Sequence, residues 1–262
     1  MEERKRPVFP YYYAPGKRLV HIVARISNQP GSLSEILELL ASRVDLIGTS
    51  TYLTNEGNAI FSGFAVVLSP GDKPNDLKKL VQSSPKTIEA RVDEGQDGVL
   101  VDSFHLGIGI GGRSFMRFRR EGLSKVFDKV VEMLESGGET LLHEEGSALG
   151  KDNAKTVIKL IGAEMAVEKT QDLRLVLRAM GWGMISVPEV DPDARGVVQV
   201  KDCFECGGGS KVRQGCHFFR GYLEGYGSTL YGLDVGSEET KCILRGDAVC
   251  EFVLKPKGSP AA

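Results

Sequence analysis

Three cysteines and one glutamate near the end of the chain constrain its fold more than any other feature. Cys216 opens a run with helical character, and Glu239, Cys242 and Cys250 follow on an apparent β-hairpin. Three thiolates and one carboxylate can complete the tetrahedral shell of a zinc ion. Because Glu239 and Cys242 are three residues apart, we expect Glu239 just before the strand or at a bulge. The pattern therefore predicts a metal site that joins a helix to a hairpin.

The other two cysteines, Cys203 and Cys206, offer a rival ligand set together with Cys216. Their CxxC spacing is common in zinc knuckles and in redox sites, although a second CxxC is missing here. Glu238 stands beside Glu239 and is the alternative carboxylate. Burial as small apolar residues would explain one or two cysteines, but it does not explain three with a glutamate. We therefore favour the first set over the rival.

Composition bounds the class of protein. The chain has 262 residues, of which 41% are hydrophobic and 26% charged, so it can build a proper core as one large domain or two ordinary ones. A net charge of −2 gives no general attraction to nucleic acid. We see neither a secretory signal nor an apolar run of about 18 residues, and we expect a cytoplasmic protein without a membrane span. In that compartment clustered cysteines bind metals more often than they form disulfides.

The first part of the chain predicts an arm and a small α+β domain. Residues 1–16 are rich in proline and tyrosine; they are either a poorly ordered end or an arm that packs on a partner subunit. Residues 17–95 then give the order β-α-β-β-α-β, which is the ferredoxin-like arrangement. Its first strand, at 17–27, has one strongly apolar face.

Residues 18 to about 93 resemble the ACT domain, a regulatory module that usually binds amino acids or related metabolites. The likeness is carried by the strand LVHIVARIS, by the turn Asn28-Gln29-Pro30-Gly31-Ser32-Leu33 and by the element order. It implies homodimerisation and a ligand at Asn28, Gly31 and Ser32, since a ligand close to a helix N-terminus needs a position without Cβ. The alternative is a tight turn in a module that pairs with another copy without a ligand. Many members have Asp where this chain has Asn28.

The rest of the chain predicts a linker at 96–103, a second α+β domain at 104–255 and a tail at 256–262. The run Gly107-Ile108-Gly109-Ile110-Gly111-Gly112 matches GxGxxG formally, but no βαβ continuation follows it. We interpret it as a flexible approach to a helix and not as a dinucleotide site. Helices follow, with a break near Gly146–Gly150, and then two strands, a helix at 216–231 and the terminal hairpin.

Residues from about 104 to 255 resemble the 4-vinyl-reductase-type domain, V4R, whose fold is similar to that of Bet3-type subunits of vesicle-tethering complexes. The likeness rests on Gly181-Trp182-Gly183, Arg220-Gly221-Tyr222-Leu223, Gly246-Asp247, Phe252 and the Cys216, Glu239, Cys242 and Cys250 spacing. It implies a closed, structural zinc site at those four residues. It also implies a ligand cavity with aromatic walls, for which Trp182, Phe218, Phe219 and Tyr222 are the candidates; core packing is the alternative for each. We expect His217 to be a bystander.

Together these features predict a regulatory protein that senses a small molecule. Its partners would be a small hydrophobic or aromatic ligand, an amino acid, or both, and a second copy of the chain as a homodimer. No catalytic constellation stands out, so we favour a protein that is not an enzyme. A Bet3-like assembly scaffold is the alternative. A reductase of a tetrapyrrole vinyl group ranks last, because the sequence shows no nicotinamide or flavin site.

Overall fold

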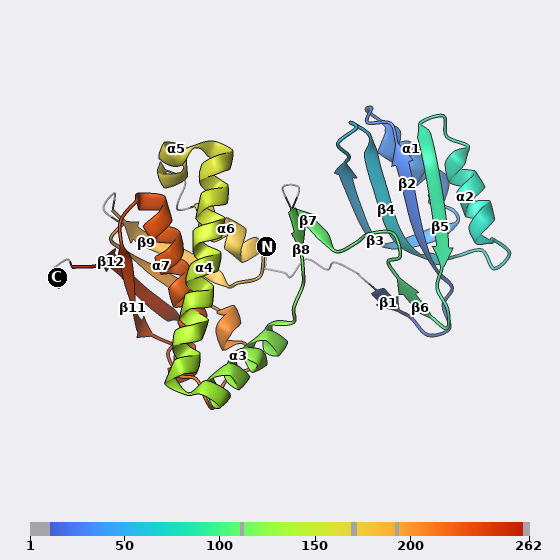
Figure 1. Ribbon diagram of the computed structural model, residues 1–262. Helices are drawn as coiled ribbons and strands as arrows, with labels where there is room; N and C mark the ends of the chain where they lie inside the picture. The colour runs from blue at the N-terminus through green and yellow to red at the C-terminus, as the bar shows by residue number, and fades with distance from the viewer. Residues whose placement is uncertain (1–10, 111–112, 169–171, 192–193, 259–262) are drawn as a thin grey trace. The chain divides into compact units, whose positions relative to one another are not determined.

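The chain folds into two compact units, Met1–Met116 and Arg117–Ala262 (Figure 1). The computed structural model describes residues 11–110, 113–168, 172–191 and 194–258. Most of the expected N-terminal arm therefore lies outside the described residues. The expected linker is part of the first unit, because β6 (Val99–Val101) pairs antiparallel with β1 (Tyr11–Tyr13).

The first unit has the predicted order of elements. These are β2 (Leu19–Ile26), α1 (Ser32–Leu40), β3 (Val44–Leu53), β4 (Ala59–Val67), α2 (Pro74–Gln82) and β5 (Thr87–Glu94). The strands form an antiparallel sheet in the order β3-β4-β2-β5. Alternate residues of β2, from Val20 to Ile26, share one core with α1 and α2, so both helices cover the same face of the sheet.

The other face of β2 is also covered. Leu19 packs with Phe64 and with Leu100 of β6 in a small second core. His21, on the same face of β2 as Leu19, is only 1% exposed and stacks on Phe64 with ring centroids 4.4 Å apart. Its Nε2 atom is 2.9 Å from the Ser62 hydroxyl. The β1–β6 ribbon thus buries a histidine that a single strand would leave half-exposed.

His21 belongs to a cluster with Asp102 and His105, whose potential metal-binding atoms lie within 4.8 Å of one another. Hydrogen bonds within the protein already occupy the carboxylate. Asp102 Oδ1 accepts the backbone N–H groups of Phe104 and His105, and Oδ2 lies 2.8 Å from His105 Nδ1. These bonds, with that between His105 and Tyr52 of β3, fasten the segment after β6 to the sheet. The Nδ1 atom of His21, 3.8 Å from Asp102 Oδ1, is buried without a hydrogen-bond partner among the described residues.

Part of the formal GxGxxG run forms a strand. Ile108–Ile110 is β7, which pairs antiparallel with β8 (Arg113–Phe115), in place of the expected flexible approach to a helix. Gly111 and Gly112 lie outside the described residues.

The second unit packs helices against a four-stranded sheet (Figure 1). Its helices are α3 (Arg120–Leu134), α4 (Ser136–Ile161), α5 (Ala163–Glu168), α6 (Leu173–Ala179) and α7 (His217–Tyr231). The strands β9 (Met184–Val190), β10 (Gly196–Lys201), β11 (Val235–Lys241) and β12 (Cys250–Pro256) form an antiparallel sheet in the order β11-β12-β10-β9. The predicted pairing of the two last strands is confirmed.

Helix α4 is continuous, so the break predicted near Gly146–Gly150 is wrong. Its glycines serve packing against α7. A Cβ atom on Gly150 would lie 2.2 Å from the carbonyl oxygen of Tyr222, and one on Gly225 would lie 2.1 Å from that of Ser147. Gly146 and Gly221 meet the opposite backbone in the same way. Two glycines four residues apart on each helix therefore let the backbones touch.

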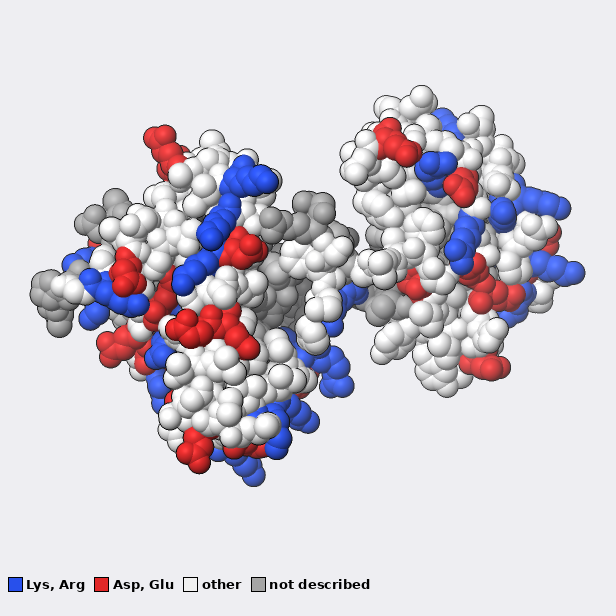
Figure 2. Space-filling model, in the orientation of Figure 1, with Lys and Arg blue, Asp and Glu red and all other residues white. Residues whose placement is uncertain are grey.

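On the face that Figure 2 shows, basic and acidic residues are interspersed over each unit. Among the described residues, none of the helices is long and apolar enough to span a bilayer.

Replacing Gly221 by alanine tests the contact between α4 and α7. We expect Gly221→Ala to lower the free energy of unfolding by about 1–3 kcal/mol, because the new Cβ would overlap the His143 carbonyl oxygen. Gly137→Ala is the matched control, since Gly137 is exposed on α4 and its Cβ would meet nothing closer than 3.9 Å. Alanine is the better helix former, so this control should gain up to about 1 kcal/mol. Denaturant unfolding measures both, and equal stabilities would contradict the close contact.

The buried His21 should titrate at low pH. Burial lowers the pKa of His21 below its ordinary value, and the neighbouring His105 and Arg91 act in the same direction against Asp102 and Asp93. Since the folded pKa lies below the unfolded one, the stability from neutral His21 is lost as pH falls below about 6.5. An NMR titration of the imidazole Cε1–H, assigned with His21→Gln, should give a midpoint below that value. A midpoint at or above it would refute this assignment.

Candidate metal centre

Five buried cysteines meet where α7 begins. Cys216 is the residue before α7, Cys242 follows β11, and Cys250 is the first residue of β12. Cys203 and Cys206 come after β10, around the short 3₁₀ turn η2 (Phe204–Cys206). None of the five is more than 6% exposed, and all are free thiols. The structure thus brings the CxxC pair into the same place as the three predicted ligands.

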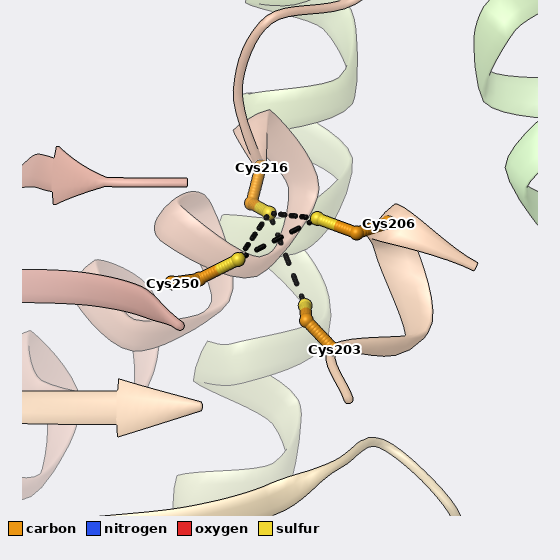
Figure 3. A group of neighbouring side chains, drawn as sticks. All are labelled: Cys203, Cys206, Cys216 and Cys250. Carbon is orange, nitrogen blue, oxygen red and sulfur yellow. Dashed lines mark hydrogen bonds between the residues drawn. The ribbon is translucent and has the colours of Figure 1, made fainter. Parts of the chain in front are cut away.

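Figure 3 draws four of these cysteines, Cys203, Cys206, Cys216 and Cys250, whose side chains point toward one another. The Sγ atom of Cys216 is 3.3 Å from that of Cys206, 3.6 Å from that of Cys250, 3.8 Å from that of Cys203 and 3.9 Å from that of Cys242. Cys206 is also 3.5 Å from Cys250 and 3.9 Å from Cys242. The edges of a tetrahedron around a zinc ion with Zn–S bonds of about 2.3 Å are about 3.8 Å long, so these separations suit zinc.

Glu239 adds a carboxylate to the group. It lies on β11 next to the register shift between Glu239 and Lys241, as expected for a residue at a bulge. Its Oε2 atom accepts the backbone N–H of Cys216 at 3.0 Å, whereas Oε1 is buried and has no conventional hydrogen-bond partner within the described part of the chain. Its neighbour Glu238 is exposed. An unsatisfied buried oxygen beside thiols is what a site that takes a cation would leave.

Among the described residues, Cys216, Glu239, Cys242 and Cys250 form one set of donors within 4.8 Å of one another. The predicted rival group of Cys203, Cys206 and Cys216 forms another such set together with Cys250. Thiolates are the soft ligands that zinc accepts in closed structural sites. The donor chemistry of this chain therefore fits a zinc ion, and the predicted set and its rival share two cysteines.

The thiols perturb one another's acidity. Contacts with neighbouring sulfurs, that with Cys203 foremost, lower the pKa of Cys250 and raise the pKa of Cys216 and of Cys206. Burial raises the pKa of Glu239, whereas the N–H of Cys216 and the thiols of Cys242 and Cys216 lower it. Cys216 stands at the N-terminus of α7, where the helix dipole favours negative charge.

A buried ion-pair network fixes the CxxC segment to α7. Glu205, inside the CxxC, is fully buried, and its carboxylate accepts the backbone N–H groups of Phe218 and Phe219 at 3.1 and 2.8 Å. Burial raises the pKa of Glu205 to about 7, although these N–H groups and Arg213 lower it. Arg213 is 1% exposed and pairs with Glu205 at 3.3 Å and with Asp128 of α3 at 2.7 Å.

Sequence reasoning missed this network. Charged residues are usually exposed, and neither Glu205 nor Arg213 has a partner nearby in the sequence. The position of Glu205 between two candidate ligands was the only available signal. The Nε2 atom of His217 lies 3.4 Å from Glu139 of α4, and neither of these two donor sets includes His217.

An apolar cavity of about 70 Å³ lies between α6, α7 and the sheet. Such a volume holds several water molecules or a small apolar compound. Its walls include Leu177, Val198, Phe219, Leu223, Tyr226 and Leu254.

Of the four aromatic residues proposed for a cavity wall, Phe219 lines this cavity. Trp182 packs in the neighbouring aromatic cluster, with ring centroids 4.8 Å from those of Phe204 and Tyr222. Phe218 stacks on Phe127 of α3, and the hydroxyl of the fully buried Tyr222 accepts a hydrogen bond from Asn153. These three residues contribute to the core around the cavity.

In the first unit, the turn with the predicted ligand residues Asn28, Gly31 and Ser32 leads into α1. Gly31 has a φ angle of 81°, which favours glycine, and stands immediately before α1. Asn28 is exposed, whereas Ser32 is buried with its hydroxyl 3.2 Å from that of Ser27. A Cβ atom on Gly31 would lie 3.4 Å from Lys86 Nζ, so the turn also faces a cation.

Comparison with known proteins places the cysteines inside a known domain. Residues 197–256 match the V4R domain family. An uncharacterized protein of Methanocaldococcus jannaschii is 28% identical over 109 residues, which are 41% of this chain; the chain thus spans 61% of that relative's length.

Three solved structures are similar to this chain at low sequence identity. The phenol-responsive sensory domain of the transcription activator PoxR, solved with phenol, has 20% identity and a TM-score of 0.46, covering 56% of this chain and 79% of its own. A trafficking protein particle complex subunit 3 from Naegleria fowleri, covalently bound to palmitic acid, has 16% identity and a TM-score of 0.41. This match covers 55% of this chain and 98% of the subunit. A vinyl-4-reductase family protein from M. jannaschii has 19% identity and a TM-score of 0.37. This match covers 54% of this chain and 83% of that protein.

The family match covers η2, α7, β11 and β12, and with them the five cysteines and Glu239. Residues 197–256 of this chain therefore form a V4R domain.

Proposed function

We propose that this chain is a non-enzymatic regulatory protein whose second unit senses a small apolar or aromatic molecule. The observation that carries the proposal is the apolar cavity between α6, α7 and the sheet. Its walls are almost entirely hydrocarbon, with Arg174 and the tyrosines Tyr226 and Tyr231 as the polar exceptions. A site of this kind selects a small, largely apolar compound with a polar group. The phenol in the PoxR sensory domain is a ligand of this chemical class.

A zinc ion held by the cysteine cluster would serve as a structural clamp. It would fasten Cys216, at the start of α7, to Cys250, at the start of β12. Both elements continue into the cavity wall, α7 through Phe219 and Leu223 and β12 through Leu254. The metal would thus fix the spacing between two walls of the binding site without contacting the ligand.

For the first unit we propose an ACT-type role. Its element order and the turn at Gly31 support this proposal, with Asn28, Gly31 and Ser32 as the residues for an amino acid or a related metabolite. We further propose that the chain acts as a homodimer in the cytoplasm, where the five free thiols would stay reduced.

Ligand binding can be tested by thermal unfolding of the full chain with a panel of phenols and aromatic acids. A binder present at about 100 times its Kd should stabilise the second unit by about 2.7 kcal/mol, which raises its Tm by about 5–10 °C. Val198→Phe should abolish the shift, since Val198 lines the cavity. Val197→Phe is the matched control, because successive residues of β10 face opposite sides of the sheet.

The absence of any shift across the panel would contradict the sensing role and favour the Bet3-like scaffold. A shift that survives Val198→Phe would place the ligand elsewhere.

Metal removal should loosen the second unit. We expect chelation under reducing conditions to cost this unit at least about 4 kcal/mol of stability, the effect of a ligand present at 1,000 times its Kd. Differential scanning calorimetry before and after chelation, with zinc added back, measures this change. The transition of the first unit is the internal control and should not move. If neither transition moves, the metal is not a structural clamp.

A further inference from the structure

We propose that Cys206, and not Glu239, supplies the fourth zinc ligand, so that this chain holds its metal with Cys206, Cys216, Cys242 and Cys250. This inference rests on the proposed structural zinc and specifies its coordination. Glu239 then acts outside the coordination shell, and Cys203 is a fifth thiol that the metal does not need.

The sulfur positions support this set. Five of its six sulfur pairs are 3.3, 3.5, 3.6, 3.9 and 3.9 Å apart, and the sixth, between Cys242 and Cys250, is within 4.8 Å. Four sulfurs with mutual separations near 3.8 Å form a tetrahedron with one centre about 2.3 Å from each, which is the geometry of a four-thiolate zinc site.

Cys206 is held in this position by its neighbour in the sequence. The Glu205 carboxylate accepts two N–H groups from the first turn of α7, and Arg213 binds the Glu205 backbone carbonyl at 3.0 Å. These bonds attach the CxxC turn to the helix that follows Cys216. The contact of 3.3 Å between the sulfurs of Cys206 and Cys216 follows from this attachment.

Glu239 makes other interactions that do not require it to bind the metal. Its Oε2 atom accepts the N–H of Cys216, and a guanidinium nitrogen of Arg245 lies 4.0 Å from the same oxygen. A carboxylate that bonds the backbone of a ligating cysteine orients that ligand. The unsatisfied Oε1 atom is the observation in favour of Glu239 as a ligand, so the two arrangements must be separated by experiment.

Zinc K-edge X-ray absorption on the full chain counts the donors directly. We expect one zinc per chain with four sulfurs at about 2.3 Å and no oxygen at about 2.0–2.2 Å. Glu239→Gln should leave this shell unchanged. Cys203→Ser, the matched control within the same CxxC, should leave it unchanged as well. Cys206→Ser should replace one of the four sulfurs by an oxygen.

Three sulfurs and one oxygen in the unaltered protein, with the oxygen lost in Glu239→Gln, would overturn the inference and leave the zinc clamp intact. A lower sulfur count in Cys203→Ser, or two zinc ions per chain, would also overturn it. A folded protein without zinc would contradict both the inference and the clamp. These outcomes are read from the wild type, Glu239→Gln and Cys203→Ser, so they do not depend on the folding of Cys206→Ser.

Discussion

The second unit depends on how five buried sulfur atoms are accommodated at the beginning of α7. Without a metal, burying these thiols beside an unsatisfied carboxylate oxygen stabilises the fold little, because hydrogen bonds between thiols are weak. A divalent cation changes this balance, since each thiol becomes a charged ligand of one centre. The cluster draws together segments from β10, α7, β11 and β12, and a cation there would fasten three strands to one helix.

Helix α7 connects this cluster to the rest of the unit. The N–H groups of its first turn donate hydrogen bonds to the Glu205 carboxylate. One side of α7 packs against α4 through Gly221 and Gly225. Another side lines the cavity through Phe219 and Leu223. Because the backbones of α4 and α7 are in direct contact, α7 has little freedom to shift sideways. A ligand in the cavity would therefore contact a helix, α7, that is fixed at its N-terminus by Glu205 and along its length by α4.

The sequence was informative where a pattern repeats or a residue type has few uses. Alternation in β2 and the order of elements predicted the first sheet, and the spacing of Cys216, Glu239, Cys242 and Cys250 located the cysteine cluster. Contacts between distant segments could not be predicted in the same way. The glycines of α4 look like a helix break until α7 is placed against them, and Glu205 and Arg213 look like surface charges until α3 and α7 enclose them. His21 likewise lies on a polar face until the β1–β6 ribbon covers it.

Elemental analysis of the purified full chain tests the central claim most directly. The account predicts one zinc per chain that survives extensive dialysis, together with fewer thiols open to modification in the native state than after chelation. A folded, metal-free chain in which adding zinc alters neither stability nor thiol accessibility would contradict it.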